Sequence, residues 1–439
     1  MKNTLNMGNK KTAAVHKTEI LLLSLFAALS FTACSKKTQE DFIPRLPADT
    51  EGSVHITGSF QNFESLEAVF NGFNSYYPEV ELTYTCLDNY AESLNELLST
   101  STDTDLYMAS LWHWDYERYS QIQNSAYDFS DGKTVDLSVF KSSALHYRNG
   151  KLYLLPVFAN STGMLVNSTI LEENSLSVPR NYSEFVEVCT ELQKKGYENP
   201  VMGYEKKPGD FYDLLIQGNL NRRLNENPSE MAALLSLEEN SGEIIREDLE
   251  KLKAFVDSGF IDRKKDLEIT DNYNSTLLRF LKGDVPFMIC TANTFSGAKK
   301  RESRSPEFTE HPFKYCFTPI PFSEEGANTL FLPSTFFCMN RNSSSVEITS
   351  EFLRYMFSEK NLNQMAQDKG LLSVTKKSTD SRFASFFNLP EESFVYRSDD
   401  FTDSMNILIR NAFFWAGTGL KSVDQVVKEF PVLEQYSPE

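Results

Sequence analysis

Residues 54–86 read VHITGSFQNFESLEAVFNGFNSYYPEVELTYTC, and three successive patterns in this stretch indicate the fold class. It opens with a short apolar strand, VHITGS, at 54–59. Apolar residues then recur at the spacing of a helix over 64–75, at Leu66, Val69, Phe70 and Phe73. The last seven residues, VELTYTC at 80–86, alternate apolar and polar residues as a strand does. The stretch therefore predicts a strand, a helix and a second strand.

The same alternation continues along the chain, beginning with a third strand, DLYMAS, at 105–110. Short links between strands and helices imply right-handed crossovers and a parallel sheet covered by helices. Later strands are predicted at 149–158, 163–167, 285–290, 315–320 and 331–340. Later helices are predicted at 90–99, 181–195, 246–259, 345–358, 399–412 and 422–433. The pattern is that of an α/β protein.

The N-terminal segment has the pattern of an export signal. Lysines at positions 2, 10, 11 and 17 precede an uncharged apolar run, ILLLSLFAALSFTA, at 20–33. Fourteen uncharged, mostly apolar residues are too few to span a bilayer as a helix, but they suit a signal peptide. The run ends in FTAC, which resembles the bacterial lipoprotein box and implies cleavage before Cys34 and lipidation there with acyl chains such as palmitate. The alternative is an ordinary secretory cleavage near Ala33, with Cys34 incidental.

Charge and cysteine content exclude several classes of protein. The formal net charge is −18, which argues against nucleic acid because such a partner requires a basic surface. Five cysteines follow Cys34 without C-x-x-C or zinc-site spacing, so we predict buried free thiols, no metal site and no cofactor. The polar segment 34–52 contains proline and no apolar periodicity, so we predict that it is a flexible tether.

Six motifs in order resemble the family 1 extracellular solute-binding proteins of bacterial ABC importers, the group that contains the maltose-type sugar-binding proteins. They are VFNGFNSYYPEVELTY (69–84), TDLYMA (104–109), RNGKLYLLP (148–156), LVNSTILEENSLSVPRNYSEF (165–185), FLKGDVPFMI (280–289) and SEKNLNQMAQDKGLLSV (358–374). The resemblance covers roughly residues 53–430. The chain departs from the family pattern at Thr104, Val166, Tyr182, TANTF (291–295) and Asn406, several of which replace aromatic residues of sugar binders.

The resemblance implies an α/β fold of two lobes, like that of periplasmic binding proteins, with mostly parallel sheets flanked by helices. Lobe I is expected over 53–160 plus 325–373, and lobe II over 161–324 plus 374–439, after a signal peptide at 1–33. The resemblance places the ligand in a cleft at the hinge, and closure of the lobes around a ligand is a known motion of such folds.

Candidate ligand residues follow from a rule that does not depend on the family. In an open parallel sheet, ligands bind beyond the carboxyl ends of the strands. The loops selected by this rule contain Phe60, Gln61, Trp112, Trp114, Asp115, Phe158, Asn160, Asn293, Phe295 and Ser334. Amide, hydroxyl and carboxylate groups suit the hydroxyl edge of a sugar, and aromatic rings suit its faces. By the resemblance, Asn160 lies where sugar-binding members often have an acidic ligand contact.

Several of these assignments have structural alternatives. Trp112 and Trp114 lie at the junction of a strand and a helix, where either ring can face the ligand; we favour Trp112. Phe158 and Phe295 fit a core between the lobes equally well, and Ser334 and Thr335 fit a simple turn. The segment KPGDFYDLL (207–215) offers Asp210 or Tyr212 as a further contact. Trp415, in NAFFWAG, is predicted to be a core residue.

The sequence favours a monomeric, lipid-anchored receptor in the bacterial cell envelope, outside the cytoplasm. It would bind a mono- or oligosaccharide, or a similar polar solute, and deliver it to the permease of an ABC importer. A sensing subunit for a membrane receptor is an alternative. A cell-surface carbohydrate-active enzyme is less well supported, because Asp115 stands nearly alone among the loops and catalytic motifs are missing; no catalytic residue is predicted.

Overall fold

The computed structural model describes residues 42–61, 64–88, 90, 104–109, 123–204, 206–267, 272–397 and 401–437. Residues Pro44–Glu439 form one compact unit, distinct from Met1–Ile43, and the features below belong to the larger unit. The predicted signal peptide, Cys34 and most of the helix predicted at 90–99 lie outside the described residues.

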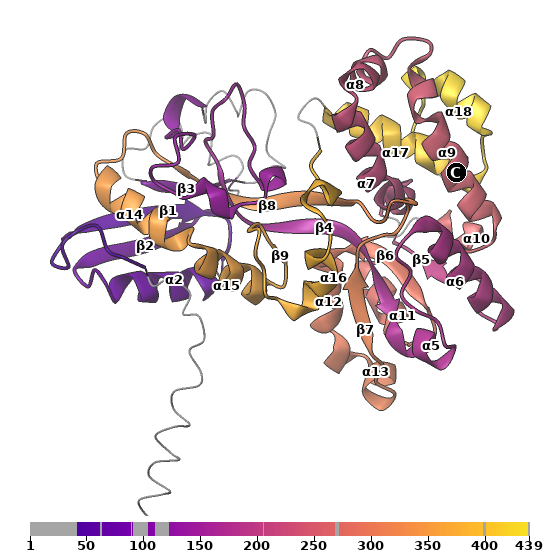
Figure 1. Cartoon of the computed structure of the whole chain (residues 1–439), viewed down its shortest axis with the longest axis horizontal. Coiled ribbons are helices and arrows are strands. Elements are labelled where there is room, and N and C mark those ends of the chain that lie inside the picture. The colour runs from indigo at the N-terminus through magenta and orange to yellow at the C-terminus, as the bar shows by residue number, and fades with distance from the viewer. Residues whose placement is uncertain are drawn as a thin grey trace, which may run out of the picture. The chain divides into compact units, whose positions relative to one another are not determined.

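Ten strands in the described residues form one hydrogen-bonded sheet (Figure 1). Its main path runs in the order β2-β1-β3-β8-β4-β6-β5, with β10 paired to β8 and both β7 and β9 paired to β4. The strands are β1 (Gly52–Gly58), β2 (Val80–Cys86), β3 (Leu106–Ala109), β4 (Leu155–Asn167), β5 (Val201–Met202), β6 (Phe287–Thr291), β7 (Tyr315–Thr318), β8 (Thr329–Met339), β9 (Leu372–Ser373) and β10 (Phe394–Val395).

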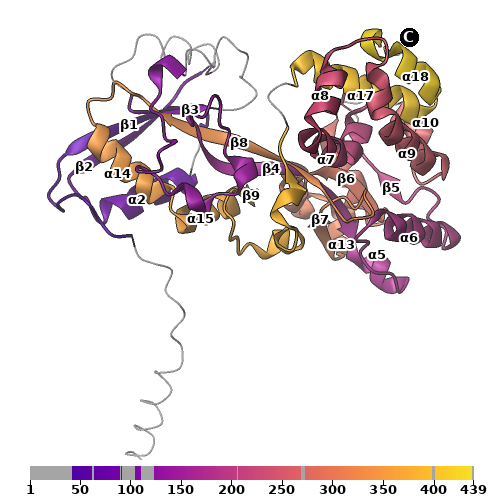
Figure 2. The same ribbon diagram turned by 45° about the horizontal axis from the view of Figure 1, so that its top comes forward.

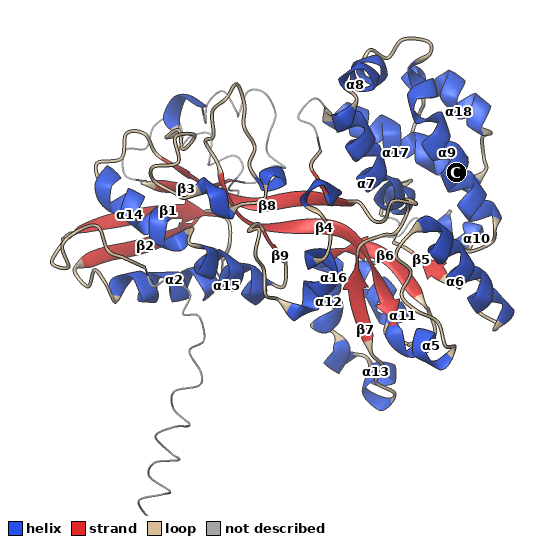
Figure 3. Cartoon of the chain, in the orientation of Figure 1, coloured by secondary structure: helices blue, strands red, loops and turns tan. Residues whose placement is uncertain are grey.

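The α-helices pack around both ends of the sheet (Figure 3). They are α2 (Glu64–Asn74), α5 (Ser168–Glu173), α6 (Tyr182–Lys194), α7 (Asp210–Glu226), α8 (Pro228–Leu235), α9 (Arg246–Asp257), α10 (Arg263–Asp266), α11 (Tyr273–Phe280), α12 (Ala292–Lys299), α13 (Pro306–Glu310), α14 (Val346–Met356), α15 (Glu359–Lys369), α16 (Ala384–Phe387), α17 (Asp403–Thr418) and α18 (Val423–Glu429). We use lobe I for β1, β2, β3, α2, α14 and α15, and lobe II for β5, β6, β7, α6, α7, α9, α12 and α17.

The sheet is mixed, whereas the sequence predicted mostly parallel pairing. Parallel pairing joins β1 to β2 and β3 in lobe I, β5 to β6 in lobe II, and β10 to β8. The long strands β4 and β8 pair antiparallel with each other and with β3, β6, β7 and β9. The prediction was wrong here because β4 and β8 run in opposite directions between the lobes and are not part of a strand–helix–strand repeat.

Strand β4 is continuous, although the sequence predicted two strands at 149–158 and 163–167. Its first half pairs with β8 and its second half with β6 and β7, so it crosses from lobe I to lobe II. The polar pair Ser161–Thr162 interrupts the apolar pattern but is buried. Thr162 carbonyl oxygen accepts a hydrogen bond from the Thr329 hydroxyl (2.7 Å), and Thr162 Oγ1 accepts one from the Leu330 N–H (3.0 Å). These bonds satisfy the polar groups of Thr162, whereas the buried Ser161 Oγ has no hydrogen-bond partner among the described residues.

Lobe I is held together by aromatic packing between α2 and α14. The Phe73 ring lies 5.3 Å from Phe352 and 4.9 Å from Tyr77, centroid to centroid. Phe73 and Phe352 are fully buried. The amphipathic period of residues 64–75, which predicted this helix, therefore places its apolar face on the core.

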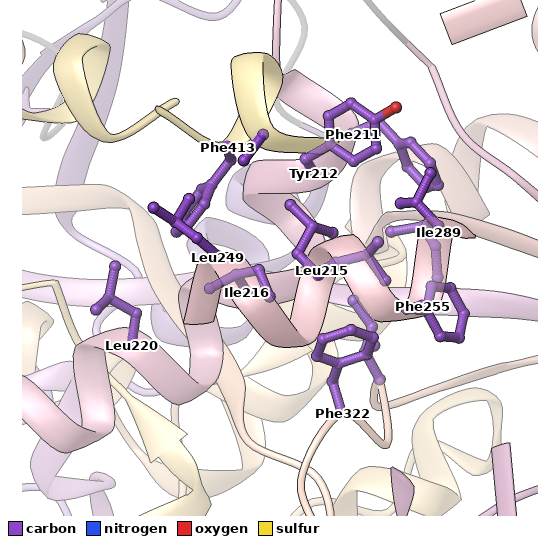
Figure 4. Close-up of a cluster of buried hydrophobic side chains, with 14 of the residues drawn as sticks. Phe211, Tyr212, Leu215, Ile216, Leu220, Leu249, Phe255, Ile289, Phe322 and Phe413 are labelled. Atoms are coloured by element: carbon purple, nitrogen blue, oxygen red, sulfur yellow. The ribbon is translucent and has the colours of Figure 1, made fainter. Parts of the chain in front are cut away.

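Lobe II has a larger core centred on α7 (Figure 4). Phe211, Leu215, Ile216 and Leu220 project from α7 toward side chains of α9, β6 and α17, and all four are buried. Burial of each such side chain stabilises the fold by about 1.5–3 kcal/mol. Trp415 packs against this core and its Nε1–H donates to the Glu434 carbonyl oxygen (2.8 Å), as expected of a structural residue.

The five cysteines after Cys34 are free thiols, as predicted. Cys189, Cys290 and Cys338 are buried, whereas Cys86 and Cys316 are partly exposed. In the described part of the chain, no helix combines the length and hydrophobicity that a bilayer span requires.

Candidate ligand-binding site

Two sets of parallel strands direct their carboxyl ends to the predicted site. In lobe I, β1, β2 and β3 run in one direction, and Phe60 and Gln61 follow β1. In lobe II, β5 and β6 are parallel, and α12 begins directly after β6. Asn293 and Phe295 lie in the first turn of α12, while Asn160 lies in β4 between the lobes.

The structure brings Asn160 and Asn293 into contact. Asn160 Oδ1 accepts a hydrogen bond from the backbone N–H of Asn293 at 3.0 Å. The N-cap residue of α12, Thr291, makes no side-chain capping bond, so Asn160 supplies an acceptor that this helix end lacks. The Asn160 side chain is partly exposed and Asn293 is exposed. The oxygen of Asn160 is thus used by the fold, and its amide nitrogen is oriented by that contact.

Phe60 is positioned by Tyr84 of β2. The Tyr84 hydroxyl accepts from the Phe60 N–H and donates to the Phe60 carbonyl oxygen, both at 3.0 Å. Lys369 Nζ, at the end of α15, lies 4.3 Å above the Phe60 ring. Because the ammonium group occupies one face of the ring, at most the other face remains for stacking. Gln61 is exposed.

Phe158 and Phe295 are buried core residues, and this corrects their assignment as stacking platforms. Phe158 is 1 % exposed and Phe295 3 % exposed. The Phe295 ring stacks on Phe317 at 5.5 Å and 9° and packs edge-on against Phe383. Rings enclosed in this way offer no face to a solute in this structure.

Ser334 is partly exposed and lies in β8, where the pairing with β4 shifts register between Phe158 and Ala159. It is therefore part of a strand irregularity and not of a turn. Trp112, Trp114 and Asp115 lie outside the described residues, so their assignment stays a prediction.

A charged cluster on lobe II includes Asp210, which the sequence offered as a contact, and three residues that were not predicted. It consists of Asp210 and Asp213 on α7, Arg410 on α17, and Arg397, which follows β10. Arg410 pairs with Asp210 at 3.5 Å. Burial raises the pKa of both Asp210 and Asp213, and it lowers the pKa of Arg397. Arg410 lies one helical turn after Asn406, which the sequence analysis named as a departure from the family pattern. Helical spacing from Asn406 was therefore the signal that could have identified Arg410.

Tyr212 does not reach the site. Its side chain is fully buried, and its ring packs against Gly417 so closely that a Cβ there would approach ring atoms to 3.0 Å. Asp210, in contrast, starts α7, and its Oδ2 accepts from the Lys207 N–H at 2.7 Å. Of the two alternatives from this segment, Asp210 is the one near exposed surface.

Two cavities lie near these elements. One of about 200 Å³ lies between α12 and α15 and is lined by Phe295, Ser296, Lys299, Lys300, Asp368, Gly370 and Arg382. A larger one of about 900 Å³ opens beside β5, and its lining includes Tyr204 and Arg279 but none of the residues predicted from the sequence. We place the candidate site by the strand ends and not by cavity size, because the polar groups converge there.

Comparison with known proteins identifies the family. A family model described as "Bacterial extracellular solute-binding protein" matches residues 61–386. The chain belongs to this family, since the match spans most of its 439 residues. It is thus a solute-binding protein and not an enzyme, and the family places it outside the cytoplasm. The resemblance found in the motifs is confirmed. A sequence search of curated proteins found no match.

Solved structures support the two-lobed α/β fold. The apo form of RafE from Streptococcus pneumoniae has a TM-score of 0.65 at 15% identity, covering 89% of this chain and 98% of that one. A family 1 extracellular solute-binding protein from Bifidobacterium longum subsp. infantis has a TM-score of 0.64 at 16% identity, covering 87% and 98%. The sugar-binding protein MalE from Xanthomonas citri has a TM-score of 0.65 at 12% identity, covering 86% and 95%.

Proposed function

We propose that this protein is a lipid-anchored receptor that binds a carbohydrate and delivers it to the permease of an ABC importer. The observation that carries the proposal is the Asn160–Asn293 contact, which fixes amide groups where β4 crosses between the lobes at the carboxyl end of β6. Amides at such a point suit the hydroxyl edge of a sugar. Exposed Gln61 and the partly exposed Phe60 add a hydrogen-bonding group and an aromatic ring from lobe I.

Two structural relatives support the choice of solute. RafE, in complex with raffinose, has a TM-score of 0.57 at 15% identity. The GacH receptor of Streptomyces glaucescens, studied in complex with acarbose, has a TM-score of 0.55 at 16% identity. These relatives bind saccharides, whereas at this level of identity their likeness to the chain concerns the fold alone. We extend their type of ligand to this chain because the polar groups named above suit it.

We further propose that the lobes, with the bounds expected from the sequence, close on the solute as a monomer, and that Trp112 or Trp114 covers one sugar face. Trp112→Ala and Trp114→Ala should then differ: one loses binding with the fold intact, and the other loses stability. Normal binding by both variants would show that the ring is elsewhere.

The ligand proposal is tested by thermal unfolding of the soluble domain, from residue 44 onward, in the presence of single solutes. A ligand at 100 times its Kd should add about 2.7 kcal/mol to the free energy of unfolding. We expect at least one mono- or oligosaccharide to stabilise the domain. Stabilisation by peptides or metal ions, with none by any saccharide, would refute the proposal.

The anchor proposal is tested on the full chain in a bacterial host. Wild-type protein should fractionate with membranes and take up labelled palmitate, and Cys34→Ala should do neither. Palmitate uptake by Cys34→Ala would refute lipidation at this residue.

A further inference from the structure

The charged cluster of lobe II has more hydrogen-bond donors than acceptors. A guanidinium carries five N–H donors. In the described part of the chain, Arg397 Nε and Arg410 Nε are buried and have no acceptor. Arg410 makes a single ion pair at 3.5 Å, to Asp210, and no described carboxylate pairs with Arg397. Two arginines in this state require further acceptors.

The neighbouring carboxylates balance part of the charge but leave the Nε–H groups of Arg397 and Arg410 without an acceptor. Asp213 accepts from the Gln217 amide, and Asp210 Oδ2 accepts from the Lys207 N–H at 2.7 Å. The pKa of Arg397 is lowered first by burial and further by the like charge of Arg410, while Asp213 opposes this shift. An additional oxyanion between the guanidinium groups would relieve the repulsion and accept their hydrogen bonds.

A second buried group without a hydrogen-bond partner lies one helical turn from Arg410. Asn406 Oδ1 is buried without a hydrogen-bond donor, and Asn406 precedes Arg410 by one turn of α17. Its amide nitrogen makes a long bond of 3.4 Å to the Phe401 carbonyl oxygen. The site thus combines donors for an oxyanion with an acceptor for a hydroxyl. Sugars that carry a carboxylate or a sulfate beside ring hydroxyls present that combination.

The cluster lies at the edge where the proposed solute site is expected. Arg397 follows β10, whose residues pair with Thr329 and Leu330 at the start of β8, next to the crossing at Thr162. Helix α7 follows β5, as α12 follows β6, and these two strands are parallel. The start of α7 contacts α17 so closely that a Cβ on Gly209 would come within 2.3 Å of the Arg410 carbonyl oxygen. Figures 1 and 2 both show α7 beside α17.

We propose that Arg397 and Arg410 form a subsite for the oxyanion of an acidic saccharide, and that Asn406 accepts a hydrogen bond from a neighbouring hydroxyl. This inference rests on the proposed carbohydrate-binding function and specifies its substrate class. The group recognised is an oxyanion on a sugar, either a planar carboxylate or a sulfate ester. This charge distinguishes the solute from the neutral sugars that the amide groups alone would select.

The test is calorimetric titration of the soluble domain with matched sugars: neutral oligosaccharides, uronic acid oligosaccharides of the same linkage, and sulfated oligosaccharides. We expect an acidic member to bind at least tenfold more tightly than its neutral counterpart. Its affinity should fall as NaCl is raised to 0.5 M, because charge attraction is screened, whereas a neutral sugar should be insensitive to salt. The uronic and sulfated arms separate the two sources of the oxyanion.

Variants locate the effect. Arg397→Gln should weaken the acidic ligand at least tenfold and leave a neutral ligand within about twofold, and Arg397→Lys should recover part of the loss. Arg246→Gln, on α9, removes a partly exposed arginine that pairs with Glu243 and Asp424, and it serves as the matched control with unchanged binding. If Arg397→Gln does not fold, the salt dependence of acidic-saccharide affinity in the wild type still tests the proposal.

The outcomes separate this inference from the function on which it rests. If neutral saccharides bind and acidic ones do not, or if Arg397→Gln weakens both alike, the oxyanion subsite is refuted while carbohydrate binding stands. If no saccharide of either kind binds, the proposed function fails and the subsite fails with it.

Discussion

Replacement of Asn160 by aspartate separates the structural role of this residue from its proposed role in binding. The Asn160 oxygen accepts from the Asn293 N–H at 3.0 Å and so caps α12 from another strand. Aspartate keeps this acceptor and places a negative charge at a helix N-terminus, which is favourable by about 0.3–1 kcal/mol. Asn160→Asp should therefore fold with unchanged or slightly higher stability. Asn160→Ala, which lacks the acceptor, should lose about 0.5–2 kcal/mol.

Binding should respond in a different way. Aspartate removes the amide nitrogen, which is the group of Asn160 that remains for a solute. Loss of one donor to a bound ligand costs about 1–3 kcal/mol, or roughly five- to 150-fold in affinity. Denaturant unfolding and calorimetric titration of the wild type and both variants measure the two effects. Equal destabilisation by both variants would refute the capping role, and wild-type affinity of Asn160→Asp would refute the ligand contact.

Three further predictions concern residues that stabilise the fold or position a candidate ligand contact. Glu351 is 3 % exposed and accepts from the Tyr77 hydroxyl (2.6 Å), the Arg45 N–H (2.8 Å) and Arg354 (2.7 Å), so Glu351→Ala should cost about 3–5 kcal/mol by denaturant unfolding. Burial opposes the Glu351 charge, but these donors outweigh it and hold the pKa below 4.5. Its contribution should be complete above about pH 4.5 and be lost as pH falls through the lowered pKa; an acid unfolding profile that Glu351→Gln leaves unchanged would contradict this. Gly218→Ala should destabilise by about 1–3 kcal/mol in thermal unfolding, because its Cβ would come within 2.2 Å of the Asn328 carbonyl oxygen; wild-type stability would show that α7 and β8 are not packed this tightly. Tyr84→Phe should weaken saccharide binding more than it weakens the fold, because it releases both hydrogen bonds to Phe60 and retains the ring; unaltered affinity in titration would exclude Phe60 from the site.

Local sequence patterns predicted the elements whose apolar face repeats regularly. Residues 80–86 form β2 with the predicted bounds, and 64–75 became α2 over Glu64–Asn74. The crossing strand β4 was divided in two because Ser161 and Thr162 look like loop residues. The hydrogen bonds to Thr162 come from Thr329 and Leu330, distant in the sequence, and no local pattern reveals such partners.

The sequence placed Asn160 and Asn293 in separate loops at strand ends. The structure places Asn160 in β4 and Asn293 in α12, where the two are in contact, and their role in ligand binding stays a prediction. The sequence left Phe295 open as a core residue or a ligand contact, and it could not decide between them because the enclosing rings, Phe317 and Phe383, come from later segments. Arg397 and Arg410 were missed because the acidic residues near them belong to α7, far earlier in the chain.

Calorimetric titration of the unit Pro44–Glu439 with saccharides is the decisive test of carbohydrate binding. We predict saturable binding of a saccharide at one site per chain, weakened by Asn160→Asp without loss of stability. Saturable binding of a peptide, an amino acid or a metal ion, with no heat from any neutral or acidic saccharide, would contradict the claim.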